Sequence, residues 1–179
     1  GEGIALLFQG WASAAQGLKQ ETRSQLEKAA EVLREIQSSE AAGEADNDLG
    51  FHCLRWGELA EGAARLQRAR ETYRQCGYIF GEAVALTNLA RAHELLGQPE
   101  EGLRFALDAR DAFDRTVVAS PAERWALENK RGMALWTASI AALELGQVDQ
   151  AFGAASQAEA ILRSLSPVDR NAASRAKNM

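Results

Sequence analysis

The 179-residue sequence has few of the residues that mark disulfide-stabilised, metal-binding and membrane proteins. Its two cysteines, Cys53 and Cys76, are too few for a disulfide framework and lie in no Cys-x-x-Cys or Cys/His metal-binding pattern. The apolar run at 4–8 is far shorter than the roughly 20 residues of a membrane-spanning helix, and no basic segment precedes it. We therefore expect a cytoplasmic protein that holds no metal and does not bind membranes.

Positive charge is also scarce, with 20 Lys and Arg against 25 Asp and Glu and a formal net charge of −5. Nucleic acid is not expected as a partner, because binding a polyanion requires clustered positive charge. The basic residues Arg65, Arg68 and Arg70 alternate with Glu61 and Glu71, which predicts exposed ion pairs along one helix.

Catalytic motifs are absent from the sequence. It contains no Gly-x-x-x-x-Gly-Lys-Ser/Thr, Gly-x-Gly-x-x-Gly or His-Glu-x-x-His pattern. His52 and Cys53 are adjacent, so on a helix they point about 100° apart and cannot share a metal ion. The other histidine, His93, is expected to be packed and hydrogen-bonded. We expect no catalytic residues, no metal and no cofactor.

A repeat of about 40 residues organises the chain. Proline is rare, and Ala, Leu, Glu, Gln and Arg dominate, which predicts an all-α fold. Glycines between helical segments recur at steps of 40, 40 and 49 residues: Gly17, Gly57, Gly97 and Gly146. Small residues keep the same register seven positions before these glycines (Gly10, Gly50, Ala90, Ser139), five after (Thr22, Gly62, Gly102, Ala151) and twelve after (Ala29, Ala69, Ala109, Ala158). Small side chains let paired helices approach closely, so the pattern predicts stacked helical hairpins.

The register predicts a single domain over 1–179 with four hairpins, at about 3–38, 43–76, 79–118 and 121–165. The first helices are expected at 3–16, 43–56, 79–96 and 121–145, and the second helices at 19–38, 58–76, 99–118 and 148–165. Ser120, Pro121 and Glu123 form an N-terminal capping signal for the longest helix, and Gly77 is placed to end the second helix of the second hairpin. A similar signal at 166–169 predicts that 166–179 starts a further or capping helix. Together with the uncapped apolar opening, this favours a fragment of a longer array.

The turn glycines, and the columns of small residues at equivalent positions in each hairpin, resemble the tetratricopeptide repeat (TPR). The match is clearest from Leu89-Ala90 through Gly97, Gly102 and Ala109, and residues 81–90 resemble the long-repeat form of bacterial regulatory proteins. The resemblance implies a right-handed α-solenoid that is not catalytic and holds a peptide or a partner helix in a concave groove. The groove residues that it implies are Leu7, Trp11, Asn47, Phe51, Arg55, Thr87, Asn88, Arg91, Glu94, Trp136 and Ile140.

Two interpretations of the groove aromatics stay open. Trp11, Phe51 and Trp136 could anchor an apolar or amphipathic segment, or they could fill the contacts between neighbouring hairpins. A clamp for acidic tails would require several cations in these columns, and only Arg55 and Arg91 qualify.

The corner at Tyr78, Ile79 and Phe80 has two interpretations as well. These side chains could form an apolar docking site for a partner or for a second copy of the chain, or they could hold the start of the next helix in place.

The sequence thus predicts a protein-interaction module of a bacterial regulatory or signalling protein. The alternatives are a sensor domain that binds a small molecule or signalling peptide and controls a fused output domain, and a structural assembly unit.

Overall fold

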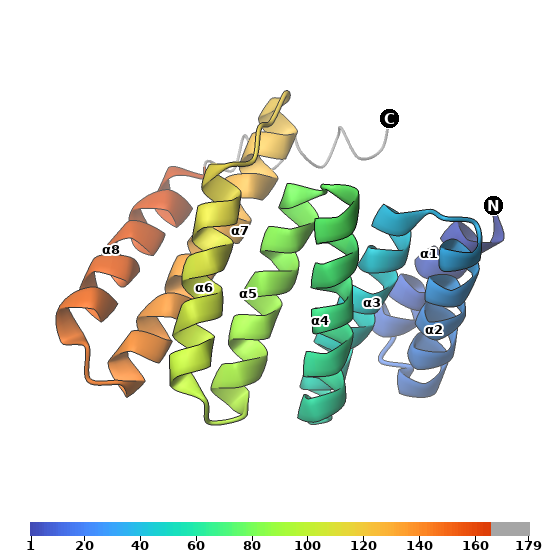
Figure 1. The fold of residues 1–179 in the computed structure, drawn as a ribbon, viewed down its shortest axis with the longest axis horizontal. Helices are drawn as coiled ribbons and strands as arrows, with labels where there is room; N and C mark the ends of the chain where they lie inside the picture. Colours follow the sequence, from blue (N-terminus) through green and yellow to red (C-terminus); the bar gives the residue numbers. More distant parts are fainter. Residues whose placement is uncertain (166–179) are drawn as a thin grey trace.

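The computed structural model describes residues 1–165, which form eight α-helices (Figure 1). In chain order these are α1 (Glu2–Ala15), α2 (Lys19–Glu35), α3 (Ser39–Arg55), α4 (Leu59–Cys76), α5 (Ile79–Leu95), α6 (Pro99–Asp114), α7 (Pro121–Glu144) and α8 (Val148–Ser164). The predicted all-α class is confirmed.

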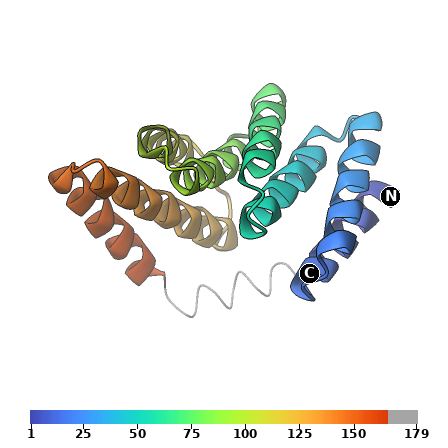
Figure 2. The same cartoon turned by 90° about the horizontal axis from the view of Figure 1, so that it is seen from below.

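Successive helices pack in antiparallel pairs, which gives the hairpins α1–α2, α3–α4, α5–α6 and α7–α8. The backbone of each odd-numbered helix also lies close to that of the next odd-numbered helix, whereas the backbones of the even-numbered helices of the described part stay apart. The row of hairpins is therefore curved, with α1, α3, α5 and α7 on its inner side. Figure 2 shows this arc.

The columns of small residues lie where the two helices of a hairpin meet. A Cβ atom added to Gly50 of α3 would lie 3.0 Å from the carbonyl oxygen of Gly62 in α4, and the reciprocal distance is also 3.0 Å. A Cβ atom on Gly102 would lie 3.2 Å from the carbonyl oxygen of Ala90. The close approach expected from these columns is confirmed, since there is no room for a larger side chain.

Left-handed backbone conformations end the helices at the turns. The turn glycines have positive φ angles: Gly17 (74°), Gly57 (80°), Gly97 (70°) and Gly146 (72°). Gly77 caps the end of α4 as predicted, with φ of 75°. The equivalent corner between α2 and α3 has no glycine, and there Gln37 adopts φ of 58°.

Three helix ends differ from the expected positions by three or four residues. Helix α2 ends at Glu35 rather than at 38, because the chain turns at Gln37, which adopts a positive φ of 58°. Helix α3 begins at Ser39 rather than at 43, because Glu40 and the alanines after it are good helix formers and an acidic residue in the first turn is favourable. Helix α6 ends at Asp114 rather than at 118, because residues 116–118 are the β-branched Thr-Val-Val.

A capping box starts α7. The Ser120 hydroxyl accepts a hydrogen bond from the Glu123 backbone N–H (3.1 Å), and the Glu123 carboxylate accepts one from the Ser120 backbone N–H (3.2 Å). This prediction from the sequence is confirmed. The signal predicted at 166–169 lies outside the described residues.

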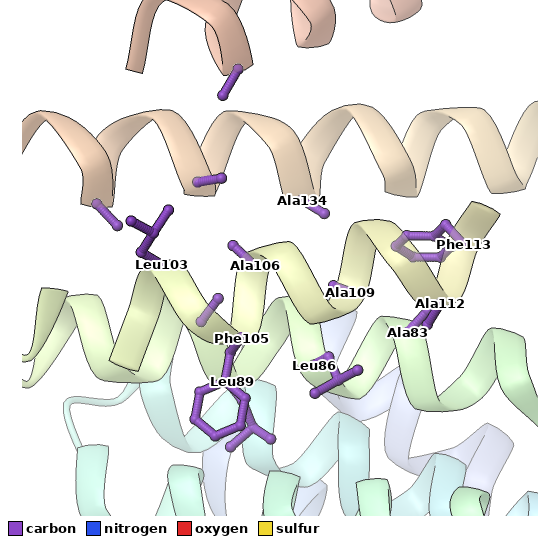
Figure 3. Packing of buried hydrophobic residues seen from close by; sticks show 14 of the residues in the cluster. Ala83, Leu86, Leu89, Leu103, Phe105, Ala106, Ala109, Ala112, Phe113 and Ala134 are labelled. Carbon is purple, nitrogen blue, oxygen red and sulfur yellow. The ribbon is translucent and has the colours of Figure 1, made fainter. Parts of the chain in front are cut away.

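The core divides into two main clusters. The larger cluster runs through α5, α6, α7 and α8 with side chains of α3 and α4, and its centre combines many alanines with Leu89, Phe105 and Phe113 (Figure 3). The smaller cluster joins α1, α2 and α3 around Leu26, Leu33 and Leu49, and it includes Cys53. No helix in the described range is long and apolar enough to span a membrane.

Candidate functional site

A cleft of about 670 Å³, here called the concave cleft, opens on the inner side of the arc between α3, α5 and α7. Its lining comes from three hairpins and includes Glu40, Glu44, Asn47, Asp48, Phe51, Tyr73, Tyr78, Phe80, Val84, Asn88, Ala126, Lys130 and Met133. A ligand in this cleft would contact the three hairpins at once.

One side of the concave cleft is acidic. Glu40, Glu44 and Asp48 lie at four-residue intervals along α3, so all three carboxylates share one helix face. The Asp48 carboxylate accepts hydrogen bonds from Trp11 Nε1 (2.5 Å) and Asn47 Nδ2 (3.3 Å). Burial raises the pKa of Asp48 above its ordinary value, and these two hydrogen bonds oppose that shift.

A pair of amides crosses from α3 to α5 within the cleft. Asn88 Nδ2 donates a hydrogen bond of 3.0 Å to Asn47 Oδ1. This bond uses one of the two N–H donors of the Asn88 amide, and its other donor and its carbonyl oxygen match the hydrogen-bonding groups of a peptide unit. Helix α7 completes the cleft with Lys130 and Met133.

A second cleft of about 510 Å³, the corner cleft, lies where the start of α5 meets the α6–α7 loop. Its apolar lining includes Ile79, Val117 and Val118. Tyr78, Phe80 and Ala126 line both clefts, so the two are adjacent along the same surface.

The structure brings part of the predicted groove together. Asn47, Phe51 and Asn88 all line the concave cleft, and 43% of the Phe51 side chain is exposed. The predicted docking corner joins the same surface, with Tyr78 and Phe80 lining both clefts and Ile79 lining the corner cleft.

Two predicted groove residues belong instead to the interior. Leu7 is buried in the cluster of α1, α2 and α3. Thr87 is also buried, and its hydroxyl donates to the Ala83 carbonyl oxygen one turn earlier in α5. Both side chains point toward neighbouring helices rather than toward the inner surface of the arc, so neither is accessible to a ligand.

The remaining predicted residues surround the concave cleft or lie beyond it. Trp11 is half-buried and packs edge-on against Phe8, with ring centroids 5.0 Å apart. Arg91 is exposed and forms an ion pair with Glu94, which is half-buried. Arg55, expected deeper in the groove, is exposed at the end of α3, close to the turn, and lines a small cleft with His52 and Trp56.

Trp136 and Ile140 lie on α7 past the end of the concave cleft. Trp136 follows Met133 by three residues and Ile140 follows Trp136 by four, so the three share a helix face. Trp136 is 55% exposed, and Ile140 is half-buried.

The corner residues also have packing roles. Tyr78 packs against Tyr73 with ring centroids 5.5 Å apart, and Phe80 packs edge-on against Phe113 at 5.9 Å. Ile79 is 37% exposed. Phe80 therefore holds the start of α5 in place, and Ile79 is accessible to a ligand.

Sequence reasoning missed the charged residues of the concave cleft, Glu40, Glu44, Asp48 and Lys130. Their four-residue spacing in α3 was a usable signal, but the expected helix start at 43 left Glu40 outside the helix. Lys130 was missed because the groove columns took only Trp136 and Ile140 from α7, both nearer its C-terminal end.

Three residues that could hold a metal ion, Cys53, Glu58 and Glu61, lie together beside the Arg23 guanidinium. Their potential ligand atoms lie within 4.8 Å of one another, and the Arg23 guanidinium donates to Glu61 (2.6 Å) and to Glu58. Burial raises the pKa of the Cys53 thiol to about 11, so the thiol stays protonated at neutral pH. Ion pairing accounts for this cluster without a metal.

The basic residues of α4 also bridge helices, in contrast to the exposed pairs predicted within one helix. Arg65 Nη2 lies 2.8 Å from Glu27 of α2, and Arg65 Nη1 lies 3.5 Å from Asp46 of α3. The pair predicted within the helix, Glu61 with Arg65, is longer, at 3.7 Å.

Comparison with known proteins shows a relationship in fold only. No protein-family model and no curated protein matches the sequence. Two crystal structures of a Podosopora anserina putative kinesin light chain with nearly identical TPR-like repeats, one of them of a single-residue variant, are similar to it. Each is 18% identical, with TM-scores of 0.63 and 0.64, and the matches cover 88% and 85% of this chain and 74% and 70% of those chains. The fold is thus that of TPR-like repeat proteins, which are generally protein–protein interaction modules and typically non-catalytic.

Proposed function

We propose that this chain is a non-catalytic interaction module that binds an extended peptide or a partner helix against its concave face. The observation that carries the proposal is the concave cleft itself, which gathers side chains from three hairpins on the inner side of the arc. Its Asn47–Asn88 pair supplies amide groups for a peptide backbone, and Phe51 supplies exposed aromatic surface. The long-repeat resemblance further supports a place in a bacterial regulatory or signalling protein.

The two amides and the ring have separate tasks in this proposal. Asn88 would donate to and accept from the backbone of the bound segment, which gives affinity that depends little on sequence. Phe51 would bury an apolar side chain of the segment, since aromatic residues dominate the energetics of such interfaces.

The test is selection of short random peptides displayed on phage against the immobilised chain, followed by affinity measurements on variants. We expect Phe51→Ala and Asn88→Ala each to weaken binding of the selected peptides by about tenfold or more. Gln67→Ala, at an exposed position of α4, is the matched control and should bind as the parent does. Circular dichroism checks that all variants stay helical.

Peptides whose affinity is the same for Phe51→Ala, Asn88→Ala and the parent would refute the proposed site. Failure to select any peptide would favour the sensor alternative, in which the groove takes a small molecule.

A further inference from the structure

The last described hairpin exposes an apolar surface, here called the end face, which consists of Trp136 of α7 with Phe152 and Leu162 of α8. These side chains are 55%, 74% and 38% exposed. Most equivalent positions in the earlier hairpins, counted from the turn glycines, are buried. The buried equivalents are Leu7, Asn47 and Thr87 for Trp136, Leu103 for Phe152, and Leu33, Tyr73 and Phe113 for Leu162. The end face is thus the open counterpart of surfaces that the earlier hairpins bury.

The first helix of the following hairpin covers these surfaces. Tyr73 of α4 lies against the next first helix, because a Cβ atom added to Gly81 of α5 would lie 2.7 Å from its ring. Leu103 and Phe113 of α6 belong to the cluster that α6 shares with alanines of α7 such as Ala134 (Figure 3). Each following helix therefore brings small residues to the large side chains of the hairpin before it.

Leu162 has only one half of this environment. A Cβ atom added to Gly132 of α7 would lie 2.8 Å from Leu162 Cδ2, and one added to Gly43 of α3 would lie 2.7 Å from the Tyr73 ring. Leu162 therefore packs within its own hairpin as Tyr73 does. Gly81 of the next helix also covers Tyr73, which is 4% exposed, whereas α7 is the one described helix that contacts α8. The end face lacks the second helix.

The sequence after α8 has the start signal of such a helix. Residues 166–169 (Ser-Pro-Val-Asp) repeat the pattern of residues 120–123 (Ser-Pro-Ala-Glu), which forms the capping box of α7. Two residues separate the end of α8 at Ser164 from Pro167, and two also separate α4 from α5. The connection therefore has the length of an observed corner between hairpins.

A helix that begins at Pro167 has an apolar face of the required kind. Its apolar residues follow at steps of four, four and three positions, which places them on one face: Val168, Ala172, Ala176 and Met179. Two of these are small, as on the helices that cover the earlier hairpins. Thirteen helical residues span about 20 Å, enough to cover the roughly 15 Å between Phe152 and Leu162.

A second copy of the chain stacked end to end fits the end face less well. Helix α1 carries the exposed Gln9 at the position where Leu49 and Leu89 are buried in the next hairpins. End-to-end stacking would bury this amide against apolar side chains, which is unfavourable. The chain's own residues after α8 are therefore the better occupant.

We propose that residues 167–179 form a helix that covers the end face, antiparallel to α8. The helix begins beside Leu162 and runs toward Phe152. Its alanines take the places that Gly81 and Ala134 have against the large side chains of the earlier hairpins. This inference goes beyond the proposed function, because the end face lies outside the concave cleft.

The test compares two substitutions in the full chain, Ala172→Glu and Ser174→Glu, which add the same charge to the proposed helix. Ala172 lies on its apolar face, and Ser174 lies on the opposite side. We expect Ala172→Glu to lower the melting temperature by about 3 °C or more, because it buries a carboxylate against the end face. The matched control, Ser174→Glu, should stay within about 1 °C of the parent.

Two measurements separate a helix packed on the end face from a helix that forms elsewhere. The backbone amides of residues 171–177 should exchange hydrogen at least about tenfold more slowly than those of an unstructured peptide. The indole N–H resonance of Trp136 should shift in Ala172→Glu and stay in place in Ser174→Glu.

Exchange of these amides at the rate of an unstructured peptide would overturn the proposal. Equal effects of Ala172→Glu and Ser174→Glu on the melting temperature and on the Trp136 resonance would overturn it as well. A dimeric mass in light scattering that returns to the mass of one chain in Phe152→Glu would assign the end face to a second copy instead.

Discussion

The first and last junctions between hairpins both contain an apolar core, but they differ in the charged groups that they bury. Where α3 packs between α2 and α4, the carboxylate of Asp46 is only 1% exposed and lies 2.7 Å from Arg34 and 3.5 Å from Arg65. Where α6 packs on α7, the contact consists mainly of alanines such as Ala106 and Ala134, with Leu103 and Phe113 (Figure 3).

The ion pairs of the first junction span a gap between helices. Helices α2 and α4 do not contact each other through their backbones, yet Arg23 reaches Glu61 of α4 and Glu58 just before it, and Arg65 reaches Glu27 of α2. Long charged side chains therefore fill the outer side of this junction.

The contrast shows that the repeat fixes the close approach of the two helices within a hairpin, whereas the side chains between hairpins can be either apolar or charged. Apolar packing stabilises the fold in proportion to the area that it buries. A buried ion pair depends on the geometry of both partners, so removing one partner costs the most stability. Substitutions in the two junctions should therefore differ in size and in their dependence on conditions.

The largest effect is expected in the apolar junction. Phe113→Ala should lower the free energy of unfolding by about 3–5 kcal/mol, because it removes a fully buried ring that packs against Phe80. Urea unfolding measures this loss. Val117→Ala at an exposed position of the α6–α7 loop is the control and should stay within about 0.5 kcal/mol of the parent. A loss under about 1 kcal/mol for Phe113→Ala would mean that this junction is not a stabilising core.

A smaller loss is expected in the ionic junction. Asp46→Ala should cost about 2 kcal/mol, less than for a fully buried pair, because the Arg34 and Arg65 side chains that it leaves behind are 38% and 20% exposed. Urea unfolding measures the loss, and Asp108→Ala, which removes a carboxylate from the surface of α6, is the control. Equal stability of the Asp46→Ala variant and the parent would show that the ion pairs contribute nothing.

The first junction should also be sensitive to alkaline pH. Burial raises the pKa of Cys53 from 9.0 to about 11, so above pH 9 the unfolded thiol loses its proton while the folded one keeps it. Stability is therefore complete below pH 9 and is lost as the pH rises toward 11, by about 1 kcal/mol between pH 9 and 10.

Thermal unfolding at pH 8, 9 and 10 measures this slope. Cys53→Ala should remove the loss between pH 8 and 9 and most of the loss between pH 9 and 10, because Tyr73 and Tyr78, whose pKa values are raised from 10.0, contribute mainly near and above pH 10. The same slope in Cys53→Ala would assign the effect to another group.

The smallest effect concerns the corners before α3 and α5. Gln37→Gly should stabilise the chain by about 0.5 kcal/mol by relieving a left-handed conformation, and Gly77→Gln should destabilise it by about 1 kcal/mol. Chemical unfolding of both variants side by side compares the corners. Changes of the same sign in the two variants would contradict this explanation.

The sequence predicted the fold well because its strongest signals are local. The turn glycines are required by positive φ angles, and the columns that contain Gly50, Gly62 and Gly102 are required by the close approach of two helices. Both causes are visible in the spacing. The capping box at Ser120 is likewise confined to four residues. Helix ends without such signals, at the end of α2, the start of α3 and the end of α6, were misplaced.

The candidate site was predicted less completely because it depends on how hairpins are placed relative to one another. A column of equivalent positions treats each hairpin alike, yet Leu7 and Thr87 are buried while Asn47 and Asn88 line the cleft. The partners Trp11 and Asp48 lie on different helices, and no spacing within one helix reveals their hydrogen bond.

The most direct test of the central claim is an NMR titration of the chain, labelled at the indole nitrogens of its tryptophans, with a peptide selected on phage. We expect the Trp11 resonance to shift, because its Nε1 donates to Asp48, which lines the concave cleft. Trp56, which packs with Lys19 and Arg23, should stay unchanged. A shift of Trp56 with Trp11 unchanged would place the peptide away from the concave face and contradict the account.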